Sequence, residues 1–364
     1  MMKTNQSPSI SESSATQSGP PAHRWTTKRL LIWVANYLDE KSIESPRLHA
    51  EILLSHILKC RRVDLYTAHD RPASPDELSR LRDLVRRAAD HEPVAYLTGE
   101  AWFFAMRLTV SPEVLIPRPS TETIIEFIMQ HQRTNATAAA NTSANDSDHV
   151  NHESSQIHHD SSDEVHQPAA ESTSSTTTPI NSPPINILDL CTGSGCLAVT
   201  LAKHLPQAQI TASDISPAAL RIAQKNADDY NLTDRVQFIE GSLFEPITGW
   251  FDFVVSNPPY ISDPEWDEVE PNVRDYEPTI ALRAGPQGLD YLQPIIEQIH
   301  HYLKPQTGIG LLEIASSQES AVRHLVSHNP HLDQTPTILR DLDGHPRILV
   351  LNLRENDQYN VAEM

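Results

Sequence analysis

The sequence has few of the residues on which several protein classes depend. Its 364 residues include three cysteines, an odd number with no CxxC pair, so neither a disulfide framework nor a four-cysteine zinc site can be built from them. Lys and Arg total 28 against 48 Asp and Glu, and the net charge of −20 argues against a general nucleic-acid coat or a polybasic membrane binder. No apolar run approaches the ~18 residues of a membrane span, and residues 1–24 lack the apolar core of a signal peptide. We therefore expect a soluble cytoplasmic protein that has no contact with membranes.

Some stretches are too poor in large apolar residues to fold on their own. Residues 1–24 are rich in Ser, Gln and Pro, and residues 131–184 are rich in Asn, Ser, Thr, Ala and His without any aromatic residue. We predict a disordered tail at 1–24, a disordered insert at 131–184 and a second tail at 355–364. The insert holds His158 and His159, but without fixed geometry a solvated polar tract is favoured over a metal site, so we predict no metal.

A small helical domain is predicted at residues 25–95. Leu30, Val34 and Leu38 recur at helical spacing. Residues 74–77 (SPDE) have the form of a capping box, with proline at the first helical position. Residues 101–110 alternate in a strand-like pattern, and we expect a β-hairpin in residues 96–120 to link this domain to the next.

The remainder, residues 121–354 apart from the insert, has an α/β pattern. From residue 185, short apolar strands alternate with glycine turns and helical segments. This alternation predicts a parallel sheet covered by helices on both faces.

A glycine-rich turn, residues 189–195 (DLCTGSG), lies between the first of these strands and a helix. Backbone at such a turn can approach a nucleotide-like ligand closely, and Asp214 ends the next strand 19 residues after Gly195, as expected for a carboxylate that binds ribose hydroxyls. The alternative is a purely structural one, in which the motif is a tight turn and Asp214 is a solvent-exposed acid. The turn also fits the G-x-G-x-x-A pattern of dinucleotide enzymes, so a nicotinamide oxidoreductase competes. Asp189 favours S-adenosylmethionine, because an acid there attracts the cationic amino group but repels a pyrophosphate.

A second motif, residues 256–260 (SNPPY), follows a later strand and should lie at the same edge of the sheet. The side-chain oxygen of Asn257 and the carbonyl of Pro258 can accept both protons of a planar NH₂ group, while Tyr260 stacks on its flat face. A rigid turn that merely ends the strand is the alternative. The two motifs together favour methyl transfer to a planar amino group.

These residues also resemble a known family. Residues 187–198 (ILDLCTGSGCLA), Asp214 and the SNPPY motif resemble class I S-adenosylmethionine-dependent methyltransferases that modify planar amino groups. Three further stretches narrow the resemblance to the peptide-chain release factor glutamine-N5 methyltransferases, the PrmC/HemK family. They are residues 91–99 (HEPVAYLTG), 114–122 (VLIPRPSTE) and 273–282 (VRDYEPTIAL).

The resemblance implies a Rossmann-like, mostly parallel sheet of seven strands, with a small N-terminal helical domain joined by a β-hairpin. It implies methyl transfer from S-adenosylmethionine to the glutamine N5 of the Gly-Gly-Gln motif in class I peptide-chain release factors. The turn would hold the methionine part of the cofactor, Asp214 the ribose and Leu243 the adenine surroundings. The candidate cofactor contacts are Asp189, Cys191, Thr192, Gly193, Ser194, Gly195, Asp214, Leu243 and Asn257. The candidate catalytic residues are Asn257, Pro258 and Tyr260, and the candidate substrate contacts are Asn257, Pro258, Pro259 and Tyr260.

The sequence departs from this family at three positions and leaves alternatives open. Cys191 stands where the family commonly has Gly, Ser120 where it has an acid, and Ser242 where it has Asp. Two alternative functions stay open, a glutamine methyltransferase of a large-subunit ribosomal protein and a DNA adenine-N6 methyltransferase. Both would use the Asn-Pro-Pro-Tyr motif in the same way. From residue 185 onward 25 acids face 11 bases, so this part carries −14 and we expect no direct nucleic-acid binding.

Overall fold

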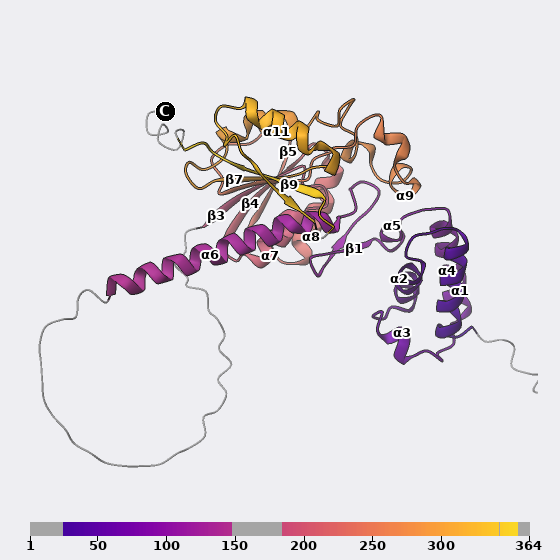
Figure 1. The fold of residues 1–364 in the computed structure, drawn as a ribbon. Helices are drawn as coiled ribbons and strands as arrows, with labels where there is room; N and C mark the ends of the chain where they lie inside the picture. Colours follow the sequence, from indigo (N-terminus) through magenta and orange to yellow (C-terminus); the bar gives the residue numbers. More distant parts are fainter. Residues whose placement is uncertain (1–24, 148–183, 342, 356–364) are drawn as a thin grey trace, which may run out of the picture. The chain divides into compact units, whose positions relative to one another are not determined.

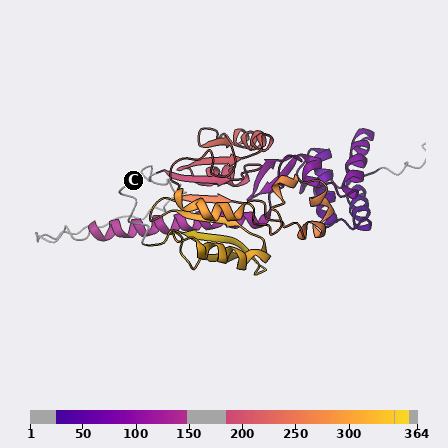
Figure 2. The same cartoon turned by 90° about the horizontal axis from the view of Figure 1, so that it is seen from above.

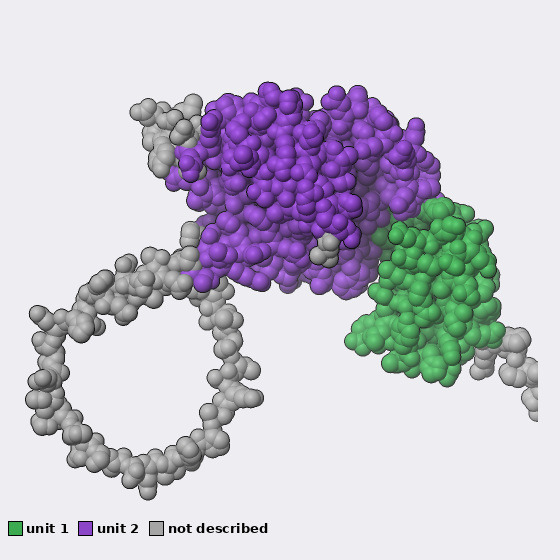
Figure 3. Space-filling model, viewed as in Figure 1, with its two compact units in different colours: residues 1–98 green, residues 99–364 purple. Residues whose placement is uncertain are grey.

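The computed structural model describes residues 25–147, 184–341 and 343–355, and it divides the chain into two compact units (Figures 1 and 3). Unit 1 is Met1–Thr98 and unit 2 is Gly99–Met364. The predicted tail at 1–24, most of the predicted insert and almost all of the tail at 355–364 lie outside the described residues. Within the described ranges, no helix is both long and apolar enough to cross a membrane.

Unit 1 is built from helices around an apolar core. Its helices are α1 (Thr27–Glu40), α2 (Pro46–Leu58), α3 (Asp64–Thr67), α4 (Pro75–Ala89) and α5 (Val94–Thr98). Leu30, Val34 and Leu38 of α1 are buried in this core, as their spacing predicted. The capping box of α4 is formed: the Ser74 hydroxyl accepts from the Glu77 N–H at 3.2 Å, and the Glu77 carboxylate accepts from the Ser74 N–H at 2.8 Å.

Unit 2 begins with a β-hairpin of β1 (Glu100–Phe103) and β2 (Met106–Thr109). Phe104 and Ala105 form its turn with positive φ values of 47° and 59°, so the strand-like pattern of 101–110 is interrupted there. The hairpin is tied to α8 (Pro217–Asp229), because the Asn226 side chain both accepts from the Thr109 N–H and donates to the Thr109 carbonyl.

In the described part of unit 2, seven further strands form one sheet in the order β5-β4-β3-β6-β7-β9-β8. Figures 1 and 2 show this sheet from two directions. Neighbours from β5 to β7 are parallel, while β9 is antiparallel to both β7 and β8. The strands are β3 (Ile185–Leu190), β4 (Ala208–Asp214), β5 (Val236–Glu240), β6 (Phe253–Ser256), β7 (Ile309–Glu313), β8 (Thr337–Arg340) and β9 (Pro346–Asn352). The predicted mostly parallel, seven-stranded α/β sheet is confirmed.

Helices cover both faces of this sheet (Figure 1). The remaining helices are α6 (Glu122–Ser147), α7 (Cys196–His204), α9 (Pro271–Arg274), α10 (Leu292–Gln298) and α11 (Glu319–His328). Side chains alternate along each strand, so Ile187 of β3 packs in one apolar cluster with α6 and α7, whereas Leu188 packs in another with α10 and α11. Short 3₁₀ turns occur at Pro119–Thr121, Glu265–Glu268, Thr279–Ala281, Ile299–His301 and Ser316–Gln318.

Helix α6 differs from the prediction of a disordered insert beginning at residue 131. The structure continues this helix to Ser147, so residues 131–147 are helical. Ile124, Ile125 and Ile128 anchor its first turns in the core, and the alanine-rich stretch 136–140 that follows has high helix propensity. Once packing has nucleated a helix, each added residue of this type extends it at little cost.

Candidate active site

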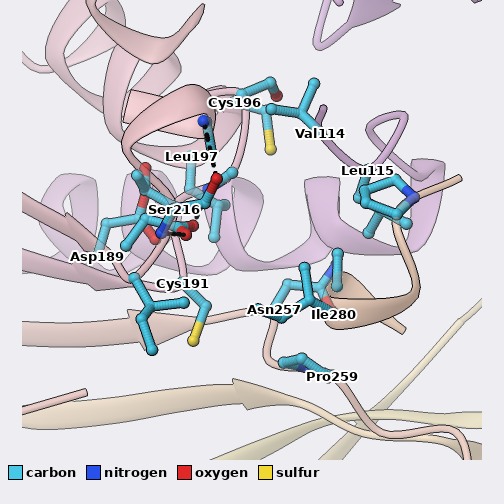
Figure 4. Close-up of a pocket in the computed structure, with 18 of the residues that line it drawn as sticks. Val114, Leu115, Asp189, Cys191, Cys196, Leu197, Ser216, Asn257, Pro259 and Ile280 are labelled. Carbon is cyan, nitrogen blue, oxygen red and sulfur yellow. Dashed lines mark hydrogen bonds between the residues drawn. The ribbon is translucent and has the colours of Figure 1, made fainter. Parts of the chain in front are cut away.

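A cleft opens at the carboxyl ends of β3, β4 and β6, where the order of the strands reverses (Figure 4). It holds about 950 Å³ of empty space, including its open mouth. Ligands of open parallel sheets bind at this point, because loops from neighbouring strands diverge there. The cleft brings together the two motifs that the sequence places 60 residues apart.

Asp189 lies near the end of β3, lines the cleft and is 1% exposed. One carboxylate oxygen, Oδ2, accepts hydrogen bonds from the Thr192 hydroxyl at 2.6 Å and the Ala198 N–H at 3.1 Å. The other, Oδ1, is buried and has no hydrogen-bond partner within the described residues. Burial raises the pKa of Asp189 to about 7, and the charge of Asp214 adds to this rise. An orphaned buried acceptor of this kind fits a cationic N–H donor in the cleft.

The backbone of the turn follows a path that favours glycine. Cys191, Gly193 and Gly195 all have positive φ, at 58°, 55° and 76°. A Cβ added to Gly193 would meet nothing within 4 Å, whereas one on Gly195 would stand 3.0 Å from the Cβ of Ala223 in α8. Gly193 therefore leaves its side of the turn open to a ligand, and Gly195 permits close packing of α7 against α8.

The two cysteines of this region are not activated. Burial, together with the charges of Asp214 and Asp189, raises the pKa of Cys191 far above its ordinary value. Burial also raises the pKa of Cys196 to about 12. Both thiols stay protonated at neutral pH, so neither acts as a nucleophile there.

Asp214 ends β4 and lines the cleft, and its carboxylate also supports the turn. Oδ2 accepts from the Gly193 N–H and Oδ1 from the Ser216 N–H, both at 2.9 Å. Burial raises the pKa of Asp214. Each carboxylate oxygen retains capacity for a further donor, so the predicted ribose contact remains chemically available.

The loop after β5 adds an apolar wall. Gly241, Ser242 and Leu243 line the cleft, and Leu243 has a positive φ of 47°. Gly241 is required because an added Cβ would stand 2.5 Å from the Cγ of Pro246. Ile215, which follows Asp214, lines the same region and is 54% exposed.

The Asn-Pro-Pro-Tyr loop follows β6, next to the turn. Asn257 and Pro259 line the cleft (Figure 4), whereas Pro258 and Tyr260 do not belong to its lining. The Nδ2 of Asn257 donates to the Thr121 hydroxyl at 3.1 Å. Its Oδ1 is buried and finds no hydrogen-bond partner in the part of the chain that the structure describes. The loop therefore carries, on a residue that lines the cleft, a buried acceptor for which the described residues supply no donor.

Tyr260 packs against the apolar cluster that contains α10 and α11. Burial, reinforced by the charge of Glu313, raises the pKa of its hydroxyl to about 12. The Tyr260 carbonyl accepts from the Gln318 side chain at 3.1 Å, and an added Cβ on Gly288 would stand 2.4 Å from this carbonyl oxygen. In this structure Tyr260 fixes the loop to its surroundings, rather than lining the cleft as the predicted stacking requires.

Sequence reasoning assigned no role to several residues around the cleft. Glu313, the last residue of β7, is 1% exposed and accepts hydrogen bonds from the hydroxyls of Ser120 and Thr121 at 2.7 and 2.6 Å. Burial raises its pKa. An acid at the end of the apolar run 309–312 is the signal that could have found it. The other lining residues without an assigned role include Val114, Leu115, Pro117, Thr121, Ile280 and Tyr291.

Comparison with known proteins identifies both parts of the chain. Residues 29–99 match the family model of the PrmC N-terminal domain, and residues 177–270 match that of the methyltransferase small domain. The release factor glutamine methyltransferase of Geobacter sulfurreducens is 36% identical over 310 residues, covering 85% of this chain and 91% of that protein. Those of Chlorobaculum tepidum and Rhodopirellula baltica are 35% and 34% identical, covering 84% and 89% of this chain and 91% and 95% of their own lengths. The chain belongs to the family of release factor glutamine methyltransferases.

Proposed function

We propose that this protein transfers a methyl group from S-adenosylmethionine to the side-chain amide nitrogen of the glutamine in the Gly-Gly-Gln motif of class I peptide-chain release factors. The observation that carries the proposal is the Asn257 Oδ1, a buried acceptor without a partner in the described residues. Asn257 lines the same cleft as Asp189, whose Oδ1 is also buried and unpartnered in those residues. The Asn257 Oδ1 suits the N–H group of a neutral planar amide, and the Asp189 Oδ1 suits a cationic N–H donor. The names of the similar proteins support the same substrate.

The residues of the turn fit S-adenosylmethionine. Asp189 would accept from its ammonium group, and the open side of Gly193 would admit its methionine part. Asp214 would bind the ribose hydroxyls, and Leu243 with Ile215 would contact the adenine. Cys191, Thr192, Ser194 and Gly195 shape the turn on which these contacts depend. When bound, S-adenosylmethionine supplies an electrophilic methyl group on a sulfonium sulfur.

The protein's own task is to orient the acceptor amide. An amide nitrogen is a weak nucleophile, because its lone pair is delocalised into the carbonyl group. The Asn257 Oδ1 would accept one N–H proton and hold the nitrogen in place, with Pro259 shaping the wall. The Pro258 carbonyl stays the predicted acceptor of the second proton, although Pro258 is not among the residues that line the cleft. These bonds strengthen as positive charge develops on the nitrogen, so they stabilise the transition state more than the bound substrate. No general base is needed before methyl transfer.

The alternative acceptors make a direct test. The protein is incubated with methyl-labelled S-adenosylmethionine and, separately, with a purified class I release factor, a large-subunit ribosomal protein and adenine-containing DNA. We expect label on the release factor, at the glutamine of its Gly-Gly-Gln motif as located by mass spectrometry. Label only on the ribosomal protein or on DNA would overturn the proposal. The net charge of the residues after 184, 25 acids against 11 bases, is the reason to expect none on DNA.

A variant separates substrate orientation from cofactor binding. Asn257→Ala should lower kcat by about 100-fold or more, because the transition state loses a preorganised acceptor. Its affinity for S-adenosylmethionine, measured by calorimetry, should change little. Turnover at the wild-type rate would remove Asn257 from the mechanism.

A further inference from the structure

The Asn257 side chain could turn either its carbonyl oxygen or its NH₂ group to the cleft, and only the oxygen can accept a hydrogen bond from the substrate. Rotation by 180° would exchange the carbonyl oxygen for the NH₂ group. An NH₂ group turned to the cleft would oppose the N–H protons of a substrate amide. The orientation of this side chain must therefore be imposed by its surroundings.

Hydrogen bonds behind Asn257 impose the useful orientation. The Thr121 hydroxyl lies 3.1 Å from the Asn257 Nδ2 and 2.6 Å from the Glu313 Oε2. A hydroxyl has one proton to donate, and a carboxylate can only accept. The Thr121 hydroxyl therefore donates its proton to the Glu313 carboxylate. The Thr121 oxygen can then only accept from Asn257, which must present its NH₂ group to Thr121 and leave its oxygen, unpartnered in the described residues, as the end available to a ligand.

The elements that carry these residues make the arrangement rigid. Glu313 ends β7, Asn257 directly follows the neighbouring strand β6, and Thr121 ends the 3₁₀ turn that precedes α6. Thr121 is fully buried and Glu313 is 1% exposed, so water does not compete for either group. The three residues form a hydrogen-bonded chain from the sheet to the cleft.

We propose that Thr121 and Glu313 are positioning residues, which hold the Asn257 amide with its oxygen toward the cleft by taking up its NH₂ group. Both act through Asn257, because the Thr121 hydroxyl bonds to the Glu313 carboxylate and to the Asn257 amide. The inference rests on the proposed function, since it assumes that Asn257 accepts from a substrate N–H.

The neighbouring Ser120 provides a matched control. Its hydroxyl donates to the other oxygen of the same carboxylate, Glu313 Oε1, at 2.7 Å. Ser120 does not belong to the cleft lining, and its hydroxyl donates to Glu313. If the carboxylate merely fastened the 119–121 turn to the sheet, loss of either hydroxyl would have similar effects. If it orients Asn257, only the Thr121 hydroxyl matters for catalysis.

The experiment compares Thr121→Val, Thr121→Ser and Ser120→Ala in the full-length protein. Valine keeps the shape of threonine without the hydroxyl, and serine keeps the hydroxyl without the methyl group. We expect Thr121→Val to lower kcat for the release factor at least tenfold, with its dissociation constant for S-adenosylmethionine within twofold of wild type. Thr121→Ser should recover most of the kcat, and Ser120→Ala should resemble wild type. Thermal unfolding of each variant shows whether it is folded.

The outcomes are distinct. Equal losses of kcat in Thr121→Val and Ser120→Ala, a kcat unchanged in Thr121→Val, or a serine variant as poor as the valine variant would overturn the positioning role. If Thr121→Val does not fold, Thr121→Cys, which retains a weak donor of similar size, takes its place and should show a partial loss. If wild-type protein labels the ribosomal protein or DNA instead, the proposed function fails, and the same variants test the positioning role on that acceptor.

Discussion

Binding of S-adenosylmethionine should depend on pH through Asp189. This carboxyl is buried, and its pKa is raised to about 7 in the unliganded protein, so an appreciable fraction is protonated near neutrality. The ionised form has an oxygen, Oδ1, for which the described residues supply no partner. If that oxygen receives the ammonium group of the cofactor, only the ionised form binds well.

The size of the effect follows from the pKa. A group with a pKa of about 7 is half ionised at pH 7 and about 3% ionised at pH 5.5. The affinity should therefore fall about 15-fold between these values, which corresponds to ~1.6 kcal/mol. An α-amino group, with an ordinary pKa of about 7.7–8.0, remains protonated throughout this range, so the cofactor's own titration does not interfere.

The effect on stability has the opposite sign. The pKa of Asp189 in the folded protein lies above its ordinary value of 3.8, so folding favours the protonated form. The unliganded protein should lose stability as pH rises from about 4 to about 7, whereas cofactor affinity rises over the upper part of the same interval. Denaturant titrations of the unliganded protein measure the first effect.

Calorimetry at pH 5.5, 6.0, 6.5 and 7.0 measures the affinity for S-adenosylmethionine. Asp189→Asn keeps the shape of the side chain but cannot ionise, so its affinity should be weaker at pH 7 by about 1.5–3 kcal/mol and nearly independent of pH. Asp214→Asn is the matched control, because Asp214 lines the same cleft and also has a raised pKa. It should still show a fall in affinity with acid, displaced to lower pH because the charge of Asp214 helps to raise the pKa of Asp189. A wild-type affinity that does not change with pH, or a slope that survives in Asp189→Asn, would refute the reasoning.

Three further predictions address the turn and an acidic segment, residues 263–270 (DPEWDEVE), that follows the Asn-Pro-Pro-Tyr loop. Asp214→Ala should weaken cofactor binding by about 1–3 kcal/mol in calorimetry, and an unchanged affinity would leave Asp214 only its support of the turn. Gly195→Ala should lower the free energy of unfolding in urea by more than Gly193→Ala does, because both positions have positive φ but only Gly195 faces a packed helix; equal losses would contradict this. If Asp267 and Glu268, which are exposed, steer the substrate electrostatically, neutralising them should lower kcat/KM for an intact release factor at low salt. The same change should leave kcat/KM for a short Gly-Gly-Gln peptide unchanged. A loss of kcat/KM that does not depend on salt would exclude electrostatic steering.

The parts of the site that the sequence predicts well are those set by local chain geometry. The strand, turn and helix at 185–204, the acid that ends β4 and the loop that follows β6 each depend on neighbouring residues. A parallel sheet then brings their ends to one edge. For this reason Asp189, Asp214 and Asn257 could be expected to share a cleft before any contact between them was known.

Packing between distant segments is where local patterns were insufficient. Residues 131–147 have a polar composition typical of disorder, yet they continue a helix whose first turns are anchored by Ile124 and Ile128. Tyr260 packs against an apolar cluster that includes residues of α10 and α11, a contact that its motif does not contain, and its stacking on an amide stays a prediction. In both cases contacts between distant segments decide the observed packing.

The orientation of Asn257 shows why a motif alone does not define this site. The Asn-Pro-Pro-Tyr sequence supplies an amide, but an amide is both donor and acceptor, and the motif does not determine which end faces the substrate. That choice depends on a hydroxyl at Thr121 and a carboxylate at Glu313, which lie 136 residues before Asn257 and 56 after it. A chain with the same loop but an apolar residue at the position of Thr121 would keep the motif and lose the constraint. The hydrogen-bonded residues behind the loop are therefore as much a part of its chemistry as the loop itself.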